Sequence, residues 1–421
     1  MVKNLLQKVS DIEAHEVKAT ALSFLFVFIL MIAYYILRPV RDAMASDWSD
    51  AEVSQLWTLN FFISTAVVAI YGLIVSKVRF QHLVPGVYAF FATSFVLFYF
   101  FMWTTSDRTL IDKSFYVWLS VFAMFHLSVF WSYMSDLFNK DQARRLFAII
   151  AAGASAGALL GPIIPTLFAG IMGIDNLIFV AATLLLIPIP IIFSLTKIKT
   201  SELHNEDEVS DSSLFKVGGN PFSGFKTFIT DPYLLSIGLF ILLYTMISTF
   251  VYFQQKNLLA EYDRATRTQI LGSIDWIVNV LTFGIAFFAT SRLVKKLGMG
   301  YTLALMPLIM CVAILILAFA PIIVILLGLQ VVRRSGNYAV TRPAREMLFT
   351  EVDKEKRFKT KPVIDVVVYR GGDMFTAWLF TGLTEGVGLG LTAVGVIGGG
   401  IAAVWAGLGI YLGKLYNRKK A

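Results

Sequence analysis

Long, continuously apolar segments dominate the chain, and short polar turns separate them. A helix needs about 20 consecutive apolar residues to cross a bilayer. Runs of that length predict twelve membrane-spanning helices, at about residues 18–38, 53–76, 83–104, 114–136, 145–169, 175–196, 231–253, 268–291, 300–319, 321–346, 363–384 and 391–413. Because the runs are continuously apolar and do not alternate with polar residues, they exclude a transmembrane β-barrel.

The longest polar segment divides these helices into two groups of six. It runs from Lys197 to Thr230 and contains an acidic, serine-rich stretch followed by Gly218-Gly-Asn-Pro221. This composition is typical of a solvated linker, and we expect a short surface helix at its end. The predicted organisation is an N-terminal six-helix bundle over residues 1–196, a cytoplasmic linker over 197–230 and a C-terminal six-helix bundle over 231–421.

The two groups also share a weak internal repeat. At an offset of 212 residues, the basic turn Asp141-Gln-Ala-Arg-Arg-Leu146 lies over Asp353-Lys-Glu-Lys-Arg-Phe358, each between a fourth and a fifth helix. The alternative is a chance match of two basic loops. Span number and linker favour a duplication, which is typical of the major facilitator fold with its substrate site near the membrane midplane. The predicted fold class is therefore an all-α membrane protein with twelve transmembrane helices in a pseudo-symmetric six-plus-six arrangement.

Composition and charge agree with a membrane protein and add an orientation. Of 421 residues, 57% are apolar or aromatic and 15% are charged, with a mean hydropathy of +0.72, whereas a soluble domain carries about 25% charged residues. With the N-terminus in the cytoplasm, the inward segments hold 24 lysines and arginines and the outward loops hold 5. The positive-inside rule then places both termini in the cytoplasm. This asymmetry explains the net charge of +8 without a nucleic-acid partner.

The first span ends in three charged residues. Arg38 and Asp42 are four residues apart and can pair, which leaves Arg41 pointing elsewhere. Since ionisable residues inside a span usually face a cavity, one interpretation is that Arg41 binds an anion there, oriented by Tyr35, with Asp42 in a coupling role. The alternative is a salt-bridged helix end whose arginines reach the membrane surface.

The tenth span carries the strongest signal, because four arginines in one hydrophobic helix cannot all face lipid. Guanidinium groups suit phosphate and carboxylate oxygens, so Arg333 and Arg334, deep in the span, are interpreted as cavity residues. For Arg342 and Arg345 the alternative is a gating network with Asp136 or Glu346. At 100° per residue, one face of this helix holds Arg334, Asn337, Tyr338, Thr341 and Arg345, with Arg342 beside it.

The eleventh span adds two carboxylates and another arginine. Arg370 and Asp373, three residues apart, can neutralise each other, and Asp365 is predicted to share a face with Tyr369, Gly372 and Thr376. A desolvated carboxylate can carry a proton, whereas one paired with arginine cannot. Asp365 and Asp373 are therefore candidates for coupling, and Arg370 is a candidate anion ligand. Asp275, in the eighth span, is either a further cavity residue or a helix-end residue.

Other patterns indicate packing or argue against enzymatic chemistry. Gly153, Gly157 and Gly161 recur every fourth residue in the fifth span, which lets two helices approach closely, and the glycine-rich segment 386–413 has the same interpretation. No GxxxxGK[ST] phosphate loop, HExxH motif or serine–histidine–acid pattern stands out, and the four histidines lack ligand spacing. A single cysteine, Cys311, excludes an intrachain disulfide. We expect no enzyme activity, no metal and no cofactor.

Three stretches resemble the nucleotide transporters, or ATP:ADP antiporters, of plastids, intracellular bacteria and their free-living bacterial relatives. The segment Tyr35-Ile-Leu-Arg-Pro-Val-Arg-Asp42 is similar to the family's YSILR…KD, with Arg41 in place of lysine. Residues 130–147 are similar to its FW…EAKRFY stretch and residues 358–373 to its KTK…VDV…RLGK stretch. Two charges differ: Asp373 replaces a lysine, and the glutamate expected upstream of residue 130 is absent.

The resemblance implies a multi-pass protein of the bacterial inner membrane that exchanges an organic anion, such as a nucleotide or another phosphorylated metabolite. We expect a monomeric secondary transporter whose partners are a small anion and the lipid bilayer. The alternatives are proton-coupled transport of another solute and, third, a membrane scaffold or sensor that does not transport. The predicted substrate ligands are Arg41, Arg334, Asn337, Tyr338, Arg370 and Tyr35, and the predicted coupling or gating residues are Asp42, Asp365, Asp373, Arg342 and Arg345.

Overall fold

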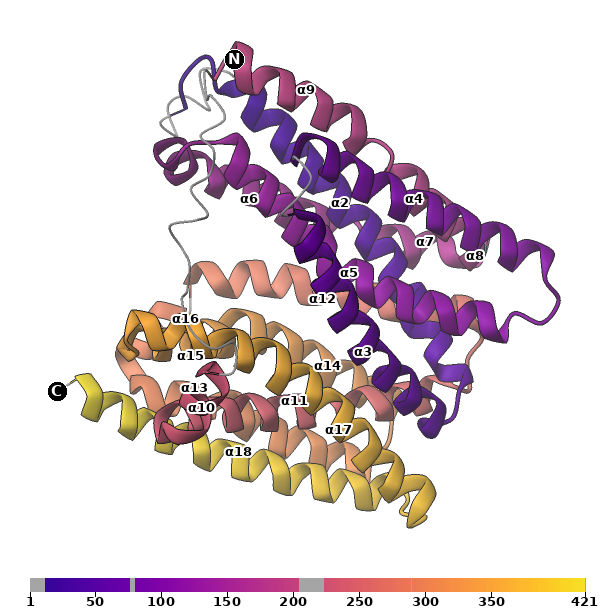
Figure 1. Ribbon diagram of the computed structural model, residues 1–421. Coiled ribbons are helices and arrows are strands. Elements are labelled where there is room, and N and C mark those ends of the chain that lie inside the picture. Colours follow the sequence, from indigo (N-terminus) through magenta and orange to yellow (C-terminus); the bar gives the residue numbers. More distant parts are fainter. Residues whose placement is uncertain (1–11, 76–79, 204–222, 289, 421) are drawn as a thin grey trace. The chain divides into compact units, whose positions relative to one another are not determined.

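The protein is described by a computed structural model that covers residues 12–75, 80–203, 223–288 and 290–420 (Figure 1). These residues form helices and short connections, with no strand among them. The basic turn at residues 77–79 and most of the predicted linker lie outside the described residues. The short helix expected at the end of that linker is present as α10 (Ser223–Thr230).

Counting interrupted helices once, the described residues form twelve long helical rods in the predicted order. In the first half they are α2 (Val17–Met44), α3 (Asp50–Val75), α4 (Phe80–Thr104), α5 (Thr109–Leu137), α6 with α7 (Lys140–Leu160 and Ile163–Met172), and α8 with α9 (Ile174–Leu184 and Pro188–Ser201). In the second half they are α11 (Pro232–Leu259), α12 (Arg264–Phe288), α13 (Thr290–Phe319), α14 with α15 (Ile323–Gly336 and Arg342–Leu348), α16 with α17 (Lys354–Pro362 and Tyr369–Thr381), and α18 (Leu391–Lys420).

Nine of the described helices are long and apolar enough to cross a membrane by length and composition alone. The predicted second, tenth and eleventh spans are not among them. The tenth and eleventh spans contain π-helical turns, namely η3 (Asn337–Thr341) in the tenth and η5 (Val363–Val368) and η6 (Gly382–Gly386) in the eleventh. Such turns are rare and often lie at functional sites.

The chain forms two compact units. Unit 1 comprises residues Met1–Met44, Phe62–Lys216 and Asp263–Trp276, and unit 2 comprises Ala45–Phe61, Val217–Tyr262 and Ile277–Ala421. Two helices are therefore divided between the units: the first half of α3 clusters with unit 2, and the first half of α12 clusters with unit 1. These units are defined by contacts and are discontinuous in the sequence, so the division into six-helix bundles at residues 196 and 231 stays a prediction.

In unit 1, the long helix α2 packs along α6 with its backbone in close contact. A Cβ atom on Gly153 would come within 2.6 Å of the Phe24 carbonyl oxygen. One on Gly157 would come within 2.4 Å of the Phe28 carbonyl oxygen. A Cβ on Gly161 would lie 2.8 Å from Cβ of Tyr35. The prediction that these glycines serve helix packing is confirmed, since any side chain would separate α2 from α6.

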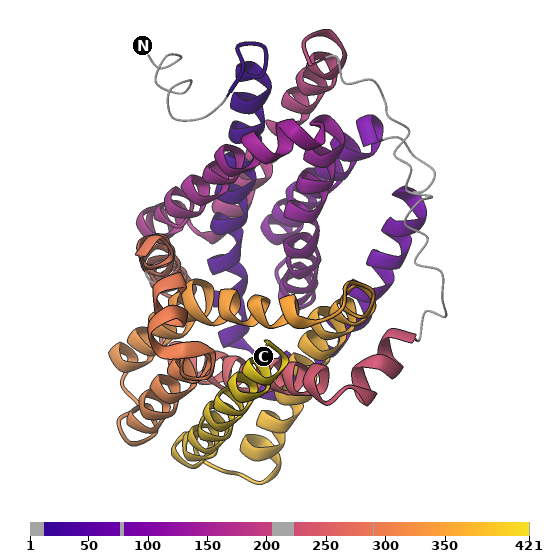
Figure 2. The same ribbon diagram turned by 90° about the vertical axis from the view of Figure 1, so that its left-hand side faces the viewer.

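In unit 2, α13 and α18 lie side by side and make the same kind of contact (Figures 1 and 2). A Cβ on Gly413 would come within 2.2 Å of the Gly300 Cα, and one on Gly409 within 3.0 Å of the Ala304 nitrogen. α18 also packs against α11, where Trp405 is buried and its ring lies 5.4 Å from that of Phe240. The packing role predicted for the glycines of this last helix is thereby confirmed at Gly409 and Gly413.

Candidate functional site

In unit 2, Arg333 near the end of α14 lies in a chain of buried amides and hydroxyls. Its Nη1 donates to the Ser248 hydroxyl at 2.5 Å, and its Nε and Nη2 donate to Oε1 of Gln330 at 3.2 and 2.7 Å. The Gln330 amide nitrogen in turn donates to Oε1 of the buried Gln255. Among the described residues, no carboxylate lies within 4.0 Å of the Arg333 guanidinium, and its hydrogen-bond partners Gln330 and Ser248 are neutral.

Other ionisable side chains of unit 2 surround this arginine. Tyr244 of α11 and Tyr369 of α17 have ring centroids 6.2 Å apart. The charges of Arg370 and Arg333 both act on the Asp373 carboxylate, yet neither forms an ion pair with it within 4.0 Å in the described part of the chain. The close ion pair between Arg370 and Asp373 expected from their spacing is therefore absent from the described residues. The residues that interact electrostatically in this group are Tyr244, Arg333, Arg334, Tyr338, Tyr369, Arg370 and Asp373.

The single polar face predicted for the tenth span assumed one continuous α-helix, and the π-helical turn η3 interrupts that register. Thr341 is only 3% exposed, whereas Tyr338 is 40% exposed. A π-helix closes i→i+5 hydrogen bonds, so the rotation per residue changes and residues after Asn337 no longer follow the 100° spacing. Arg334, Asn337 and Arg345 are half-buried, and Arg342 is exposed.

The gating network predicted for this span is found in part. Nη2 of Arg345 lies 3.2 Å from Oε1 of Glu346, and the Lys361 ammonium contacts the other carboxylate oxygen of Glu346 at 2.6 Å. The alternative partner, Asp136, pairs instead with Lys199 at 3.1 Å in unit 1. Glu346 is thus the carboxylate that holds Arg345 and Lys361 together.

Asp365 does not share a face with Gly372 and Thr376, as its spacing had predicted. It lies in η5 and is exposed, whereas Gly372 and Thr376 are buried in α17. The π-helical turn between them rotates Asp365 away from that face. Arg345, Lys361 and Arg342 exert their charges on the Asp365 carboxylate, which places it beside the Glu346 network.

In unit 1, the charged end of α2 forms a compact network. Nε and Nη2 of Arg41 both donate to Oδ1 of Asp42, at 2.9 and 2.7 Å, and its Nη1 donates to the Ser120 hydroxyl at 3.2 Å. The expectation that Arg41 points away from Asp42 is therefore wrong. Arg38 lies 3.9 Å from Asp42 and 3.6 Å from the buried Asp275.

Aromatic side chains complete this network. The Arg41 guanidinium carbon lies 5.4 Å from the ring centroid of Tyr116, within the range of a cation–π contact. Tyr35, predicted to orient a substrate, is buried and packs against Tyr34 with ring centroids 5.3 Å apart. Because Asp42 neutralises Arg41, the positive charge here is much weaker than around Arg333.

Several polar partners in these networks were not predicted from the sequence. Gln330 carries a readable signal, since it lies one turn before Arg333 in an otherwise apolar stretch. Ser248 and Ser120 carry none, because isolated hydroxyls in a span usually donate to their own helix backbone. Only the packing of α11 against α14 and of α2 against α5 brings these hydroxyls to an arginine.

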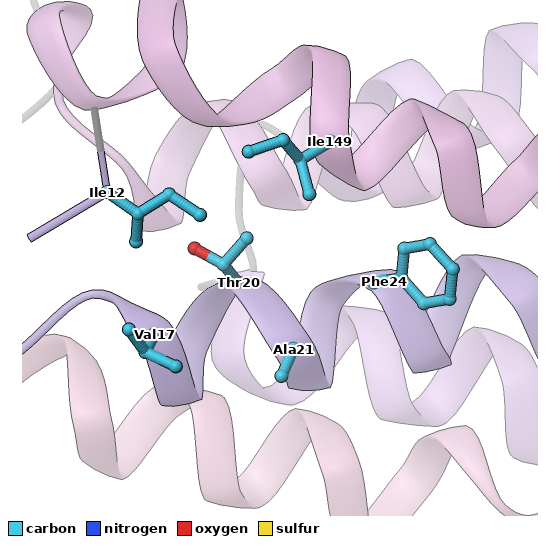
Figure 3. Close-up of a pocket in the computed structure, with 6 residues that line it drawn as sticks. All are labelled: Ile12, Val17, Thr20, Ala21, Phe24 and Ile149. Carbon is cyan, nitrogen blue, oxygen red and sulfur yellow. The ribbon is translucent and has the colours of Figure 1, made fainter. Parts of the chain in front are cut away.

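A cavity of about 270 Å³ lies between α2 and α6 in unit 1, beyond their closest approach (Figure 3). Among the described residues that line it, Thr20 alone has a polar side chain, and its hydroxyl already donates to the Glu16 carbonyl oxygen at 2.9 Å. The lining residues of the cavity are Ile12, Val17, Thr20, Ala21, Phe24 and Ile149.

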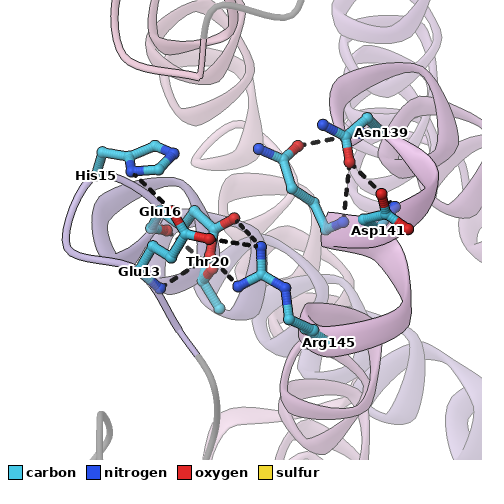
Figure 4. A network of polar contacts seen from close by, with 8 residues as sticks. Glu13, His15, Glu16, Thr20, Asn139, Asp141 and Arg145 are labelled. Carbon is cyan, nitrogen blue, oxygen red and sulfur yellow. Dashed lines mark hydrogen bonds and ion pairs between the residues drawn. The ribbon is translucent and has the colours of Figure 1, made fainter.

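A polar cluster next to this cavity brings together Glu13, His15 and Glu16, whose possible ligand atoms lie within 4.8 Å of one another (Figure 4). Nη2 of Arg145 lies 2.7 Å from Oε1 of Glu16 and 3.2 Å from Oε1 of Glu13. The guanidinium group therefore supplies the positive charge that these carboxylates need. This arrangement is an ion-pair network that fastens the start of α2 to α6.

Comparisons with known proteins agree with this architecture. The sequence profile of the Major Facilitator Superfamily matches residues 23–344. The crystal structure of the nucleoside transporter NupG is similar, with a TM-score of 0.65 and 14% sequence identity over 95% of this chain and 99% of that chain. A bacterial homolog to the human lysosomal transporter Spinster, in an inward-facing and unoccupied conformation, gives a TM-score of 0.56 and 14% identity over 97% of each chain.

At this identity the two structures establish the fold and no substrate. No protein of curated function matches the sequence. The profile match covers most of the chain, and the matched structures span nearly its whole length. This multi-pass membrane protein therefore belongs to the Major Facilitator Superfamily and has the twelve-helix fold of its secondary transporters.

Proposed function

We propose that this secondary transporter carries an organic anion, with a nucleotide or another phosphorylated metabolite as the preferred class, and that it works by exchange. The observation that carries the proposal is the group of arginines in unit 2. Arg333 is held by neutral partners, and the charges of Arg333 and Arg370 act on one carboxylate, Asp373. The group keeps a net positive charge inside a membrane-spanning region, which an anionic substrate would balance.

The guanidinium group favours an anion with several oxygen atoms over a monatomic anion such as chloride. Arginine presents planar pairs of N–H donors that match carboxylate and phosphate oxygens. Tyr338, which is exposed at the same helix, and the Tyr244–Tyr369 pair offer aromatic faces and hydroxyls to an organic group. Arg41 in unit 1 is proposed as an auxiliary ligand only, since Asp42 already holds two of its nitrogens. Exchange, as opposed to proton coupling, is supported by the resemblance to ATP:ADP antiporters.

A ligand panel tests this proposal directly. A ligand that binds the folded state raises its stability by RT ln(1 + [L]/Kd). We expect the melting temperature of the detergent-solubilised protein to rise with an organic anion from a set of nucleotides, sugar phosphates and dicarboxylates. The shift should vanish in Arg334→Ala and persist in Arg144→Ala, which removes an exposed arginine of unit 1. A shift only with neutral or cationic solutes would overturn the proposal.

The second candidate function is proton-coupled transport, favoured by Asp373. This carboxylate lies in the eleventh span beside two arginines, with no ion pair to either among the described residues, and it is the proposed proton carrier. Uptake that follows an imposed pH gradient and is lost in Asp373→Asn would favour this candidate. A third candidate, a membrane scaffold or sensor without transport, would show neither ligand shift nor uptake.

A further inference from the structure

Helix α10 in unit 2 is amphipathic and does not span the membrane. Its Phe228 packs on α11, where a Cβ on Gly238 would come within 2.5 Å of the Phe228 ring. Phe225 and Ile229, one turn apart on the neighbouring face, are 37% and 63% exposed, and Lys226 beside them is exposed. A short helix with an exposed apolar stripe bordered by a lysine is typical of a segment that lies in the membrane interface.

The C-terminal end of α18 adds positive charge next to this helix. The Lys419 ammonium lies 4.4 Å from the ring centroid of Tyr233, which is the second residue of α11 and follows α10 closely in the chain. Lys414 and Arg418, one turn apart on α18, are exposed. Tyr411, one turn before Lys414, is 49% exposed, and tyrosines are enriched where a protein meets the membrane interface.

Two carboxylates, Asp231 and Glu351, lie close enough to act on Tyr233, whose ring Lys419 contacts. Asp231 caps α11 by accepting from the backbone nitrogens of Tyr233 and Leu234, and Asp353 lies 3.8 Å from Lys356 at the start of α16, the helix that packs against α10. In the ranges that the structure describes, Lys226, Lys414 and Arg418 have no carboxylate within 4.0 Å. Among the described residues, these three cations therefore have no direct acidic partner at this end of unit 2.

Several basic residues of unit 1 have an acidic partner within 4.0 Å. Arg145 pairs with Glu16 at 2.7 Å, as Figure 4 shows, Lys199 pairs with Asp136 at 3.1 Å, and Lys18 pairs with Glu202 at 3.1 Å. The exposed Arg144 lies 3.7 Å from Asp141. Lys140 and Lys197 of unit 1 have no such partner among the described residues, so unpaired charge alone does not mark unit 2. The feature that marks it is the exposed apolar stripe of α10 beside the cations.

We propose that this end of unit 2 is a binding surface for anionic phospholipid headgroups, formed by Phe225, Lys226, Ile229, Lys414, Arg418 and Lys419. The lysines and the arginine would contact the phosphate groups, while Phe225 and Ile229 enter the boundary between headgroups and acyl chains. Clusters of basic residues at the cytoplasmic membrane surface attract anionic lipid in this way. A soluble acidic protein or an RNA would match the charges alone and would leave the apolar stripe of α10 uncovered.

The test uses the full-length protein in nanodiscs that contain phosphatidylcholine with or without phosphatidylglycerol. Native mass spectrometry counts the phosphatidylglycerol molecules retained on each protein. The variant K226Q/K414Q/R418Q/K419Q should retain severalfold fewer than the unmodified chain. The matched control K18Q/K140Q/R144Q/K197Q removes the same charge from exposed positions of unit 1 and should retain nearly the full number.

A second variant, F225S/I229S, keeps every charge and should also lower retention, because the apolar contact is part of the proposed surface. Melting curves in phosphatidylcholine alone establish that each variant is folded before lipids are compared. Equal retention of phosphatidylglycerol by the four-charge variant and its control would overturn the proposal. So would retention of as much phosphatidylcholine as phosphatidylglycerol by the unmodified chain. Displacement of the lipid by millimolar inorganic phosphate or by an acidic peptide would also overturn it, because such a site recognises charge without lipid.

Discussion

Arginines of similar chemistry have very different partners in this protein. Arg345 shares Glu346 with Lys361, and Arg41 is held by Asp42, whereas Arg333 donates to an amide and a hydroxyl only. Charged hydrogen bonds to neutral groups hold a side chain in place without cancelling its charge. Burial and sequence neighbours alone do not show which of these arginines keeps its charge. The identity of the hydrogen-bond or ion-pair partner does.

Arg333→Gln should reduce the affinity for the transported anion and leave the fold intact. A hydrogen bond to a charged group contributes about 1.5–3 kcal/mol, so the loss should be about 10- to 100-fold in Kd. Isothermal titration of the purified variant with the best ligand of the panel measures it. The control is Arg144→Gln, an arginine of unit 1 whose side chain is 82% exposed, which should bind as the unmodified chain does. Unchanged affinity in Arg333→Gln would remove this residue from the proposed site.

Two adjacent arginines, Arg144 and Arg145, provide a test of burial. Arg145 pairs with Glu16, which is 1% exposed, whereas the side chain of Arg144 is 82% exposed. Arg145→Ala leaves a buried carboxylate without its cation and should cost about 3 kcal/mol of unfolding free energy. Arg144→Ala should change the unfolding free energy by less than about 0.5 kcal/mol.

Thermal or denaturant unfolding in one detergent, with both variants measured side by side, provides the comparison. Similar destabilisation by Arg144→Ala and Arg145→Ala would mean that the Glu16 network does not fasten α2 to α6.

At the scale of elements, glycine spacing predicted contacts correctly, whereas ideal helix geometry did not. The four-residue repeat of Gly153, Gly157 and Gly161 depends only on one helix face meeting one neighbour, and the structure has that contact. The face predicted for the tenth span assumed 100° per residue throughout, and the π-helical turn η3 breaks that assumption. Local sequence does not specify such a turn, because its cost is offset by tertiary contacts.

Gly157→Ala should destabilise unit 1, since its Cβ would lie 2.4 Å from the Phe28 carbonyl oxygen and 2.8 Å from Cβ of Met31. We expect a loss of about 1–3 kcal/mol, the usual range for overpacking. The control is Gly328→Ala in α14, where a Cβ meets nothing within 4 Å. That change should be neutral or stabilising by up to about 1 kcal/mol, because alanine favours the helix. The melting temperatures of the two variants provide the measurement. A lower melting temperature for Gly328→Ala than for Gly157→Ala would contradict the close packing of α2 on α6.

At the scale of the whole molecule, each compact unit contains a segment from the other half of the sequence. The first half of α3 is fastened in unit 2 by the Asp50–Lys256 ion pair at 2.9 Å and by the hydrogen bond between Ser54 and Thr381 at 2.8 Å. In unit 1, Arg264 of α12 pairs with Asp112 at 2.7 Å. These partners lie 152 to 327 residues apart in the sequence, so no local pattern indicates them.

Transport mode is a property of the whole protein and is measured in proteoliposomes. If the protein is an exchanger, uptake of the labelled anion should rise at least about 10-fold when the vesicles are preloaded with the same unlabelled anion, because return of the carrier requires cargo. A protonophore should leave this stimulated uptake unchanged. Uptake into empty vesicles that stops on adding the protonophore would favour proton coupling. Uptake absent in both cases, with a folded protein, would favour a membrane scaffold or sensor.

The sequence by itself determined the helices, the membrane environment and the chemistry of the residues inside the spans. Span length, apolar continuity, glycine spacing and the rarity of arginine in lipid are local properties, and each is readable without a structure. Only the tertiary structure decided which charge meets which partner: Asp136 pairs with Lys199 and not with an arginine of the tenth span, and Arg41 turns to Asp42. The physical reason is that an ion pair depends on distances of a few ångströms between helices distant in sequence, whereas helix formation and burial depend on neighbouring residues.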